Sequence, residues 1–413
     1  MNVLLSATGQ AMLKPLSPKE RQPLSRREST AAARAGKVCI LNSFAIRPNA
    51  GGPIGVIRDS IARIKGRNWE LRSYAEVGKH SLARRAFHRA VGPMLWNYPR
   101  KAKLNREIEH NKLCFSRLQG IDEYPLIWFH DLISYFACRP LMTKRQGAVL
   151  QLHHPELPAK EASHHGWYNA WDVRLIERLQ DWALRDSDVL VLANRGASRI
   201  YGGLLQKAKR VTYLPNAICE TPVKECPRLS SDLVSFVFLG RRNAVKGFDL
   251  LIDAFRQARA INGKLTLYVI GEGAKVEGPG VVDLGFSSVP ETWLAAADCV
   301  VVPNRSSYLD LNVLQALSLN KPVLMTCSHG HQDFKDASSA IYAVEEASVE
   351  SLRKALLDAP RWLSSLSAGN LENRQLYEER YSLTVFAKLL DEVCADLVSS
   401  WTSKSSHDDA VPH

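Results

Sequence analysis

The stretch that decides the fold begins at residues 236–247, which read FVFLGRRNAVKG. The four apolar residues at its start are typical of a buried strand, and a short basic loop begins at Gly240-Arg241. After Lys246-Gly247 the apolar residues recur at helical spacing, at Phe248, Leu251, Ile252 and Phe255. The stretch therefore predicts a strand, a basic loop and an amphipathic helix in succession.

The same alternation continues to residue 327. Strands are expected at 265–270, 299–302 and 322–326, with a helix at 311–319 before the last of them. Strands that alternate with helices form parallel βαβ units, and ligands of such sheets lie beyond the carboxyl ends of the strands. We expect the basic loop and the turns at 271–273 and 303–304 to share that edge.

The first half of the chain has a similar but fainter pattern. Strands are expected at residues 37–41, 126–129, 148–152, 188–193 and 211–214, and helices after residue 56, at 174–184 and from about 381. The last helix has its apolar face at Val385, Leu389, Val393 and Leu397. A glycine-rich turn at Gly51-Gly52 lets a ligand approach the backbone, although most such turns only let a helix pack on a sheet. His130-Asp131 and His153 follow two strands, where they are either site residues or surface histidines.

Length and composition predict two domains, because the 413 residues exceed one ordinary core and 46% of them are hydrophobic. We expect a disordered basic tail at 1–36, a first domain at 37–218, a linker at 219–230, a second domain at 231–375, a C-terminal helix crossing back to the first domain at 376–400 and a polar tail at 401–413. The eight cysteines have irregular spacings that suggest neither a disulfide framework nor a zinc site. With no apolar run long enough to cross a bilayer and no signal-peptide pattern, we expect a cytoplasmic protein.

The net charge of +12 is concentrated in two segments. Residues 1–36 carry six Lys or Arg and two Glu, whereas residues 79–117 carry ten Lys or Arg and two Glu. A local basic patch implies an anionic partner. In residues 79–117, aromatic and aliphatic residues alternate with the charges, which is typical of a helix at an anionic membrane surface and equally of a solvated helical face. No nucleic-acid-binding motif accompanies the charge, so no nucleic-acid partner is expected.

Several short motifs follow the basic loop in order: Gly271-Glu272-Gly273, Leu284-Gly285-Phe286, Ala297-Asp298, Pro303-Asn304, Gln315-Ala316-Leu317 and Lys321-Pro322-Val323. With the loop, they resemble the donor-binding half of the family-4-type retaining glycosyltransferases. The first half is similar more faintly, at Gly51-Gly52, His130-Asp131, His153, Ser187-Asp188 and Pro215-Asn216. The resemblance covers residues 37–398 and implies an α/β fold of the GT-B type, in which two Rossmann-like domains face each other across a cleft.

The resemblance also implies a division of roles. A nucleotide-sugar donor would bind mainly to the second domain, and a sugar or lipid-linked acceptor mainly to the first. Arg241 and Lys246 would hold the diphosphate and stabilise it as a leaving group without a metal ion or other cofactor, unless the loop is only a basic turn that caps a strand. His153 would position the sugar rather than act as a base, and His130 and Asp131 would lie on the acceptor side. The donor-binding residues would be Gly51, Gly52, Gly240, Gly271, Ser307, Leu309, Asp310, Leu311 and Gln315.

The donor loop departs from the family pattern at two places. Where the family carries two glutamates, this chain has Ser307 and Gln315. Gln315 still offers an amide to ribose hydroxyls, whereas Ser307 has a shorter reach and no charge. Where the family has a glycine-rich turn, Asp310 is expected to cap the next helix, and its carboxylate would compete with a bound phosphate unless it points aside.

These observations favour a cytoplasmic glycosyltransferase of surface-polysaccharide or glycolipid assembly, on the inner face of the membrane. The missing glutamates leave open a non-catalytic nucleotide-sugar-binding subunit. The basic segment alone leaves open a nucleic-acid-binding protein. A sugar-nucleotide epimerase would need acidic residues in the cleft that the sequence does not reveal.

Overall fold

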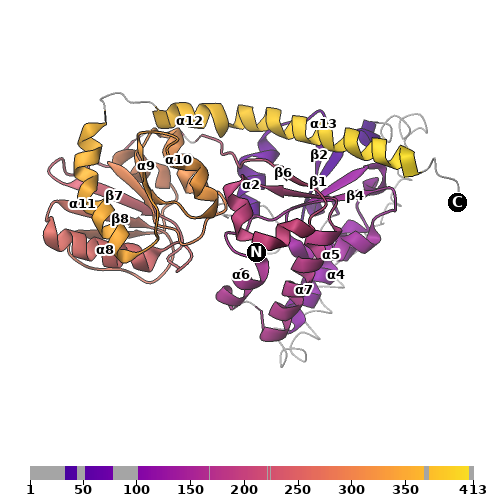
Figure 1. Cartoon of the computed structure of the whole chain (residues 1–413), viewed down its shortest axis with the longest axis horizontal. Helices are drawn as coiled ribbons and strands as arrows, with labels where there is room; N and C mark the ends of the chain where they lie inside the picture. Colours follow the sequence, from indigo (N-terminus) through magenta and orange to yellow (C-terminus); the bar gives the residue numbers. More distant parts are fainter. Residues whose placement is uncertain are drawn as a thin grey trace, which may run out of the picture.

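The computed structural model describes residues 33–43, 52–77, 101–166, 168–220, 222–223, 225–366 and 372–408. Gly51, most of the expected basic tail and residues 79–100 of the basic segment lie outside the described residues. Two α/β domains lie side by side, the first in indigo to magenta and the second mainly in orange (Figure 1). Within the described residues, no helix is both long and apolar enough to span a membrane.

The described part of the first domain contains a six-stranded parallel sheet in the order β2-β1-β3-β4-β5-β6. Its strands are β1 (Val38–Asn42), β2 (Trp69–Ser73), β3 (Leu126–Phe129), β4 (Gly147–Gln151), β5 (Val189–Leu192) and β6 (Val211–Tyr213). Its helices are α2 (Gly52–Asp59), α4 (Lys101–Phe115), α5 (Leu132–Cys138), α6 (Pro158–His165) and α7 (Ala170–Asp186). Alternate strand residues enter separate cores: Ile40 packs with α2, and its neighbours Cys39 and Leu41 pack with α4, α5 and α7. Because both faces are covered, several strands read as continuous apolar runs.

The second domain repeats this architecture in its described residues, with a parallel sheet in the order β12-β11-β10-β7-β8-β9. Its strands are β7 (Val234–Leu239), β8 (Leu265–Ile270), β9 (Val281–Gly285), β10 (Cys299–Val302), β11 (Val323–Thr326) and β12 (Ile341–Val344). Its helices are α8 (Phe248–Ile261), α9 (Pro290–Ala296), α10 (Leu311–Ser318) and α11 (Val349–Ser365). Phe236 and Phe238 of β7 pack against α8 and α11, whereas Val237 between them faces the opposite core. The central strand is therefore buried on both faces.

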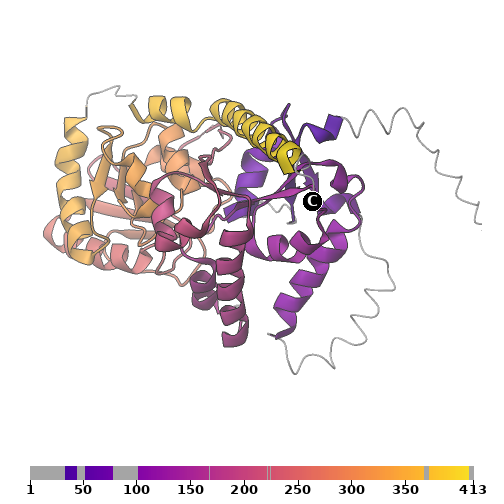
Figure 2. The ribbon, with the colours of Figure 1, turned by 45° about the vertical axis from the view of Figure 1, so that its right-hand side comes forward.

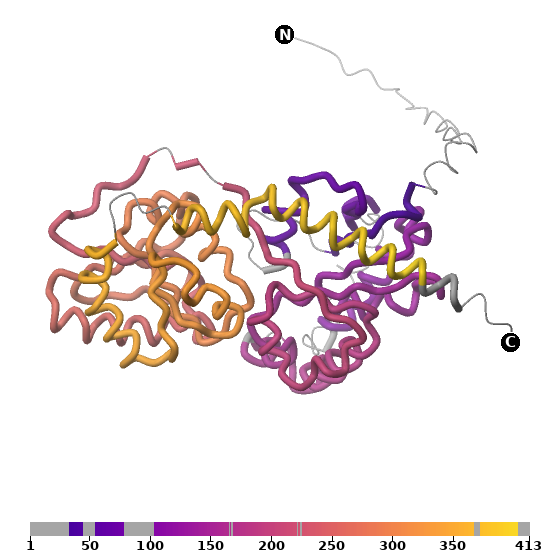
Figure 3. Tube along the Cα trace, turned by 45° about the horizontal axis from the view of Figure 1, so that its top comes forward, coloured from indigo at the N-terminus to yellow at the C-terminus, as the bar shows by residue number. Residues whose placement is uncertain are grey.

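The C-terminal helices connect the two domains. Helix α12 (Glu372–Arg380) packs against α10, and the Tyr377 hydroxyl donates to the Ile218 carbonyl at 3.1 Å. Helix α13 (Leu383–Asp408) then runs across the first domain, as the yellow ribbon in Figures 1, 2 and 3 shows. The helix continues to Asp408, so residues 401–408 of the expected polar tail are helical, and the Trp401 indole donates to the Arg145 carbonyl at 3.0 Å.

The buried face of α13 includes Leu397, as expected, but its other members lie one position later than predicted from the sequence. Phe386, Leu390, Cys394 and Leu397 pack on the first sheet with Val38 and Ile40. Val385, Leu389 and Val393, which were expected on this face, are only partly buried at its margin. The expected tail also ends earlier than residue 36, because Arg34 belongs to the folded domain: Nη1 donates to Glu123 at 2.8 Å.

The two domains touch through one continuous core. Tyr308, Leu309 and Phe334 of the second domain are buried in the same cluster as Ala193 and Ala197 of the first. The 3-10 turn at His329–Phe334 packs against the turn at Gly196–Ile200. The contact brings the carboxyl-end loops of the two sheets together.

Candidate functional site

The loops after β7 and β8 meet at the carboxyl edge of the second sheet. The N–H of Gly240 donates to the Ile270 carbonyl at 3.0 Å, so the chain passes directly from β7 alongside β8. A Cβ at Gly271 would lie 2.0 Å from the Gly240 carbonyl oxygen, and Gly271 has a φ of +136°. Both requirements restrict the position to glycine. Gly271 therefore holds the two strand ends closer than a side chain at this position would allow.

The basic loop between β7 and α8 carries three cations with different surroundings. Arg241 is exposed, and in the described part of the chain no hydrogen bond or ion pair engages its guanidinium. Arg242 is buried against Asp283 of β9, whose Oδ2 accepts from Nη1 at 2.6 Å. This pair holds the pKa of Asp283 down at about 2. Lys246 reaches the start of α10. Arg242 therefore braces the loop, and Arg241 and Lys246 remain as candidates for an anionic ligand.

Lys246 contacts the Asp310 carboxylate. Burial lowers the pKa of Lys246 to about 7, and the charge of Arg241 acts in the same direction. The contact with Asp310 opposes this, because a neighbouring negative charge favours the ammonium form. Glu161 of α6, in the first domain, also favours it. Lys246 thus lies where both domains act on its charge.

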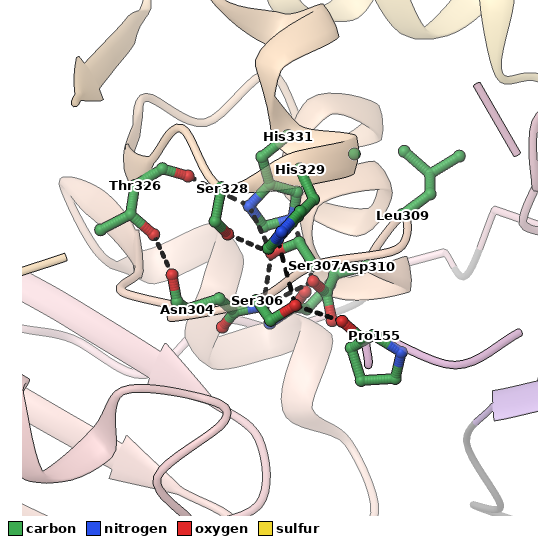
Figure 4. A network of polar contacts seen from close by, with 12 residues as sticks. Pro155, Asn304, Ser306, Ser307, Leu309, Asp310, Thr326, Ser328, His329 and His331 are labelled. Atoms are coloured by element: carbon green, nitrogen blue, oxygen red, sulfur yellow. Dashed lines mark hydrogen bonds and ion pairs between the residues drawn. The ribbon is translucent and has the colours of Figure 1, made fainter. Parts of the chain in front are cut away.

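Asp310 occupies the N-cap position of α10, but its side chain forms no capping hydrogen bond, which corrects the expectation that it caps the helix. Its Oδ2 accepts from Nδ2 of Asn304 at 2.6 Å and lies 2.9 Å from Nε2 of His331 (Figure 4). Oδ1 faces Lys246. A charge-assisted contact is stronger than a bond to a backbone N–H, which explains why the carboxylate turns from the helix.

Ser307 is fully buried and lies within the same polar network. Its Oγ lies 3.1 Å from Nδ2 of Asn304, 3.0 Å from Oγ of Ser328 and 3.0 Å from Nδ1 of His331 (Figure 4). Because these neighbours engage its hydroxyl, the Ser307 side chain stabilises the loop from its buried side. Gln315 lies on α10 and is partly exposed, with its side chain engaged by no described residue.

The loop from Pro303 to Asp310 contacts the first domain at several points. Oγ of Ser306 donates to the Pro155 carbonyl, and the Leu309 carbonyl accepts from Nδ2 of Asn216 at 3.2 Å. Leu309 is buried by this contact, and Leu311 begins α10. The loop therefore forms part of the domain interface as well as the edge beside Lys246.

His153 and His130 form a buried pair at the carboxyl edge of the first sheet. Nδ1 of His130 lies 2.9 Å from Nε2 of His153, and the His153 ring lies 5.8 Å from the Tyr308 ring across the interface. Burial lowers the pKa of His130 to about 3 and that of His153 well below its usual value. Nδ1 of His153 is buried with no hydrogen-bond partner among the described residues. His153 thus faces the second domain as a neutral ring, with His130 behind it.

The carboxylate of Asp131 is used within the first domain to cap a helix. Asp131 is the N-cap of α5, and its Oδ1 accepts from the N–H of Ser134 at 2.7 Å. Its Oδ2 accepts from Oγ of Ser43 at 2.8 Å. Gly52 is the first residue of α2, and Gly51 before it lies outside the described residues.

The structure brings together Lys246, Asp310, Ser307 and the Gly240–Gly271 edge, with His153 opposite them. The sequence analysis missed His331, which lies beside Asp310. Its signal was available, because His331 follows β11 at the same sheet edge as the residues that were selected.

Comparisons with known proteins agree with this geometry. Residues 234–359 match the family model described as glycosyl transferases group 1. No curated protein sequence matches the chain.

Solved structures match over most of the chain. Sucrose-phosphate synthase from Thermosynechococcus elongatus is 15% identical, with a TM-score of 0.63 over 88% of this chain and 99% of that chain. HepE from Anabaena, in complex with UDP and glucose, is 14% identical, with a TM-score of 0.57 over 87% of this chain and 99% of that chain. These likenesses confirm the GT-B fold that the resemblance implies.

Proposed function

We propose that this protein is a retaining glycosyltransferase that uses a nucleotide sugar as donor. The bond between the sugar anomeric carbon and the diphosphate oxygen breaks, and a bond from that carbon to an acceptor hydroxyl oxygen forms on the same face. The nucleoside diphosphate leaves and takes the acceptor proton, so no protein base is needed.

One observation carries this proposal. Lys246, Arg241 and the N-terminus of α10 converge on one sheet edge, opposite His153 of the other domain. The first N–H groups of a helix have no partner within it, and its N-terminus favours negative charge. A diphosphate would meet two cations and a helix dipole there. These groups stabilise the charge that builds on the leaving phosphate.

His153 suits a role in positioning the sugar. Burial depresses its pKa, which makes it a weak base. Nε2 of His153 faces Nδ1 of His130, whereas Nδ1 of His153 is engaged by no described residue. That nitrogen would be available to a sugar hydroxyl.

The first experiment is thermal stabilisation by nucleoside diphosphates, since a ligand that binds only the folded protein raises its stability by mass action. UDP is a suitable first choice, because HepE, with the same fold, was crystallised with UDP-glucose. We expect at least one nucleoside diphosphate to raise Tm, and K246M to reduce the shift. Transfer should persist in EDTA, since the two cations take the place of a metal ion. If no nucleoside diphosphate shifts Tm, the proposed donor site is wrong.

We also propose that the acceptor is lipid-linked or lies at an anionic membrane surface, as in surface-polysaccharide or glycolipid assembly. The basic residues of 79–117 support this, together with Trp171 at the start of α7, which is 71% exposed beside Arg174. Trp and Arg side chains are favoured at membrane interfaces. The protein should sediment with anionic liposomes at low salt and less so as W171A, whereas I261A, at an exposed residue of the second domain, should behave as wild type. Failure to sediment removes only the membrane part.

A non-catalytic nucleotide-sugar-binding subunit is the second candidate. It is favoured by Ser307, which stands where the family has a glutamate and whose hydroxyl is engaged inside the protein. A panel of nucleotide sugars separates the two. Saturable binding without transfer or donor hydrolysis would favour the subunit.

A further inference from the structure

Asp310 is held by three groups of the protein, and one of them is the lysine that the proposed function assigns to the diphosphate. Oδ1 contacts Lys246, whereas Oδ2 is held by Asn304 and His331. The Asp310 side chain is only 12% exposed and that of Lys246 17%, so water screens their contact weakly. A diphosphate that binds Lys246 must therefore take it from this carboxylate.

The side of Asp310 away from Lys246 is firmly supported. Asn304 and His331 are fully buried, and both also contact Ser307 (Figure 4). The His331 ring is fixed on both sides: Nδ1 lies 3.0 Å from Oγ of Ser307 and 3.3 Å from the Thr326 carbonyl oxygen, and Nε2 lies 2.9 Å from Oδ2 of Asp310. Burial lowers the pKa of His331 to about 3, which keeps the ring neutral. The carboxylate therefore keeps two partners when Lys246 leaves it.

Lys246 is the mobile member of the contact. Its ammonium lies at the end of a flexible four-carbon stem, whereas the Asp310 side chain is short and attached to the first turn of α10. The backbone of Lys246 is fixed separately, by its N–H donating to Oδ1 of Asn243 at 3.0 Å. The ammonium can turn toward a phosphate while both backbones stay in place.

We propose that Asp310 competes with the diphosphate for Lys246 and thereby promotes release of the nucleoside diphosphate after sugar transfer. This inference rests on the proposed function. Once it has lost the proton taken from the acceptor, the product carries one more negative charge than the nucleotide sugar, so Lys246 and Arg241 would hold it more tightly than the donor. A fixed carboxylate beside the phosphates weakens that hold and regains Lys246 when the product leaves.

The test is D310N, which removes the charge and keeps the size of the side chain. We expect its Kd for the nucleoside diphosphate to fall about 10- to 100-fold, because a competing charge contact is lost. The dissociation rate should fall in parallel, the donor Kd should fall less, and kcat should fall as release becomes slow. Calorimetry gives the Kd, and stopped-flow displacement gives the rate. A carboxylate with a merely structural role would instead leave product binding unchanged or weakened when replaced.

D249N is the matched control. Asp249 is an exposed acid in the first turn of α8, paired with Arg305, so its replacement removes one negative charge from the same domain without touching Lys246. Its product Kd should stay within about threefold of wild type, since exposed charges are screened by salt. If the Kd for the nucleoside diphosphate falls equally in D249N and D310N, the change reflects net charge alone and the inference is wrong.

The outcomes separate this inference from the proposed function. If wild type binds nucleoside diphosphate and D310N binds it no more tightly, Asp310 does not compete, and the donor site stands. If folded wild type and D310N both fail to bind, the proposed function fails. Should D310N not fold, a wild-type crystal with UDP decides: the inference requires Lys246 on a phosphate and Asp310 still beside His331, and a Lys246–Asp310 contact that persists overturns it.

Discussion

Arg241 and Arg242 are neighbours in sequence, and we expect alanine substitution to separate their roles completely. The Arg242 guanidinium is buried against Asp283 and lies 5.6 Å from the Phe248 ring centre. R242A leaves the Asp283 carboxylate, whose side chain is 5% exposed, without its cation. Removing one partner of a buried ion pair costs about 3–5 kcal/mol of unfolding free energy. That loss corresponds to a fall in Tm of roughly 6–20 °C for a domain of this size.

R241A should behave in the opposite way. Arg241 is exposed and no described residue pairs with it, so its loss should change the unfolding free energy by no more than about 0.5 kcal/mol. Loss of a charge-assisted hydrogen bond to phosphate, worth about 1.5–3 kcal/mol, should weaken binding of nucleoside diphosphate about 10- to 100-fold. Thermal unfolding without ligand and calorimetry with UDP measure both quantities. If R241A unfolds as early as R242A, or binds UDP like wild type, the division of roles in this loop is wrong.

Four further results are expected. The pKa of Asp283 is depressed to about 2 in the folded protein. The stability that its carboxylate contributes is therefore present above the unfolded pKa of about 3.9 and is lost as the pH falls toward 2. Urea titrations at pH 5, 4 and 3 should show a shallower pH dependence of the unfolding free energy for D283N than for wild type. L390A should cost about 2–5 kcal/mol in chemical denaturation because Leu390 is fully buried on the inner face of α13, whereas K388A on the exposed face of the same helix should be neutral. G271A should cost about 1–3 kcal/mol and weaken UDP binding, since its Cβ would meet the Gly240 carbonyl, and unchanged melting would contradict the close approach. UDP affinity should fall by up to about tenfold per pH unit above 7, as Lys246 loses its proton. In K246R, calorimetry across pH 7.5–9 should show no such dependence of UDP affinity on pH, because arginine stays charged.

Strands with both faces buried could be predicted from the sequence, whereas the edge strands β2, β9 and β12 could not; among the edge strands of the described residues, β6 alone was expected, at 211–214. The runs that become β7, β8 and β10 are apolar except for Ser235 and Thr266, because helices cover both faces of the sheet. The edge strands β2 and β9 read WELRS and VVDLG, without a clear period. In β9 the polar residue Asp283 is buried only because Arg242, distant in sequence, neutralises it. No local pattern contains that information.

The face of α13 illustrates a related limit. Val385, Leu389 and Val393 form one apolar series at helical spacing, and Phe386, Leu390 and Cys394 form a second series one position later. Both satisfy the helical period, so periodicity alone cannot choose between them. Phe386 and Leu390 fill the core with Val38, whereas Val385, Leu389 and Val393 are only partly buried. The choice depends on the shape of the sheet surface, which the helix sequence does not contain.

Two aspartates at helix N-termini differ in whether they cap the helix, and the cause is the nearest cation. Asp131 was expected on the acceptor side, yet its carboxylate caps α5, where Ser134 and Ser43 supply its donors. Asp310 was expected to cap α10, yet it turns to Lys246 and leaves the cap unmade. At Asp310 the contact with a charged donor prevails over a bond from the backbone N–H groups of α10. Sequence shows that an aspartate stands before a helix, but the cation that redirects it comes from a loop 64 residues earlier and is placed by the sheet.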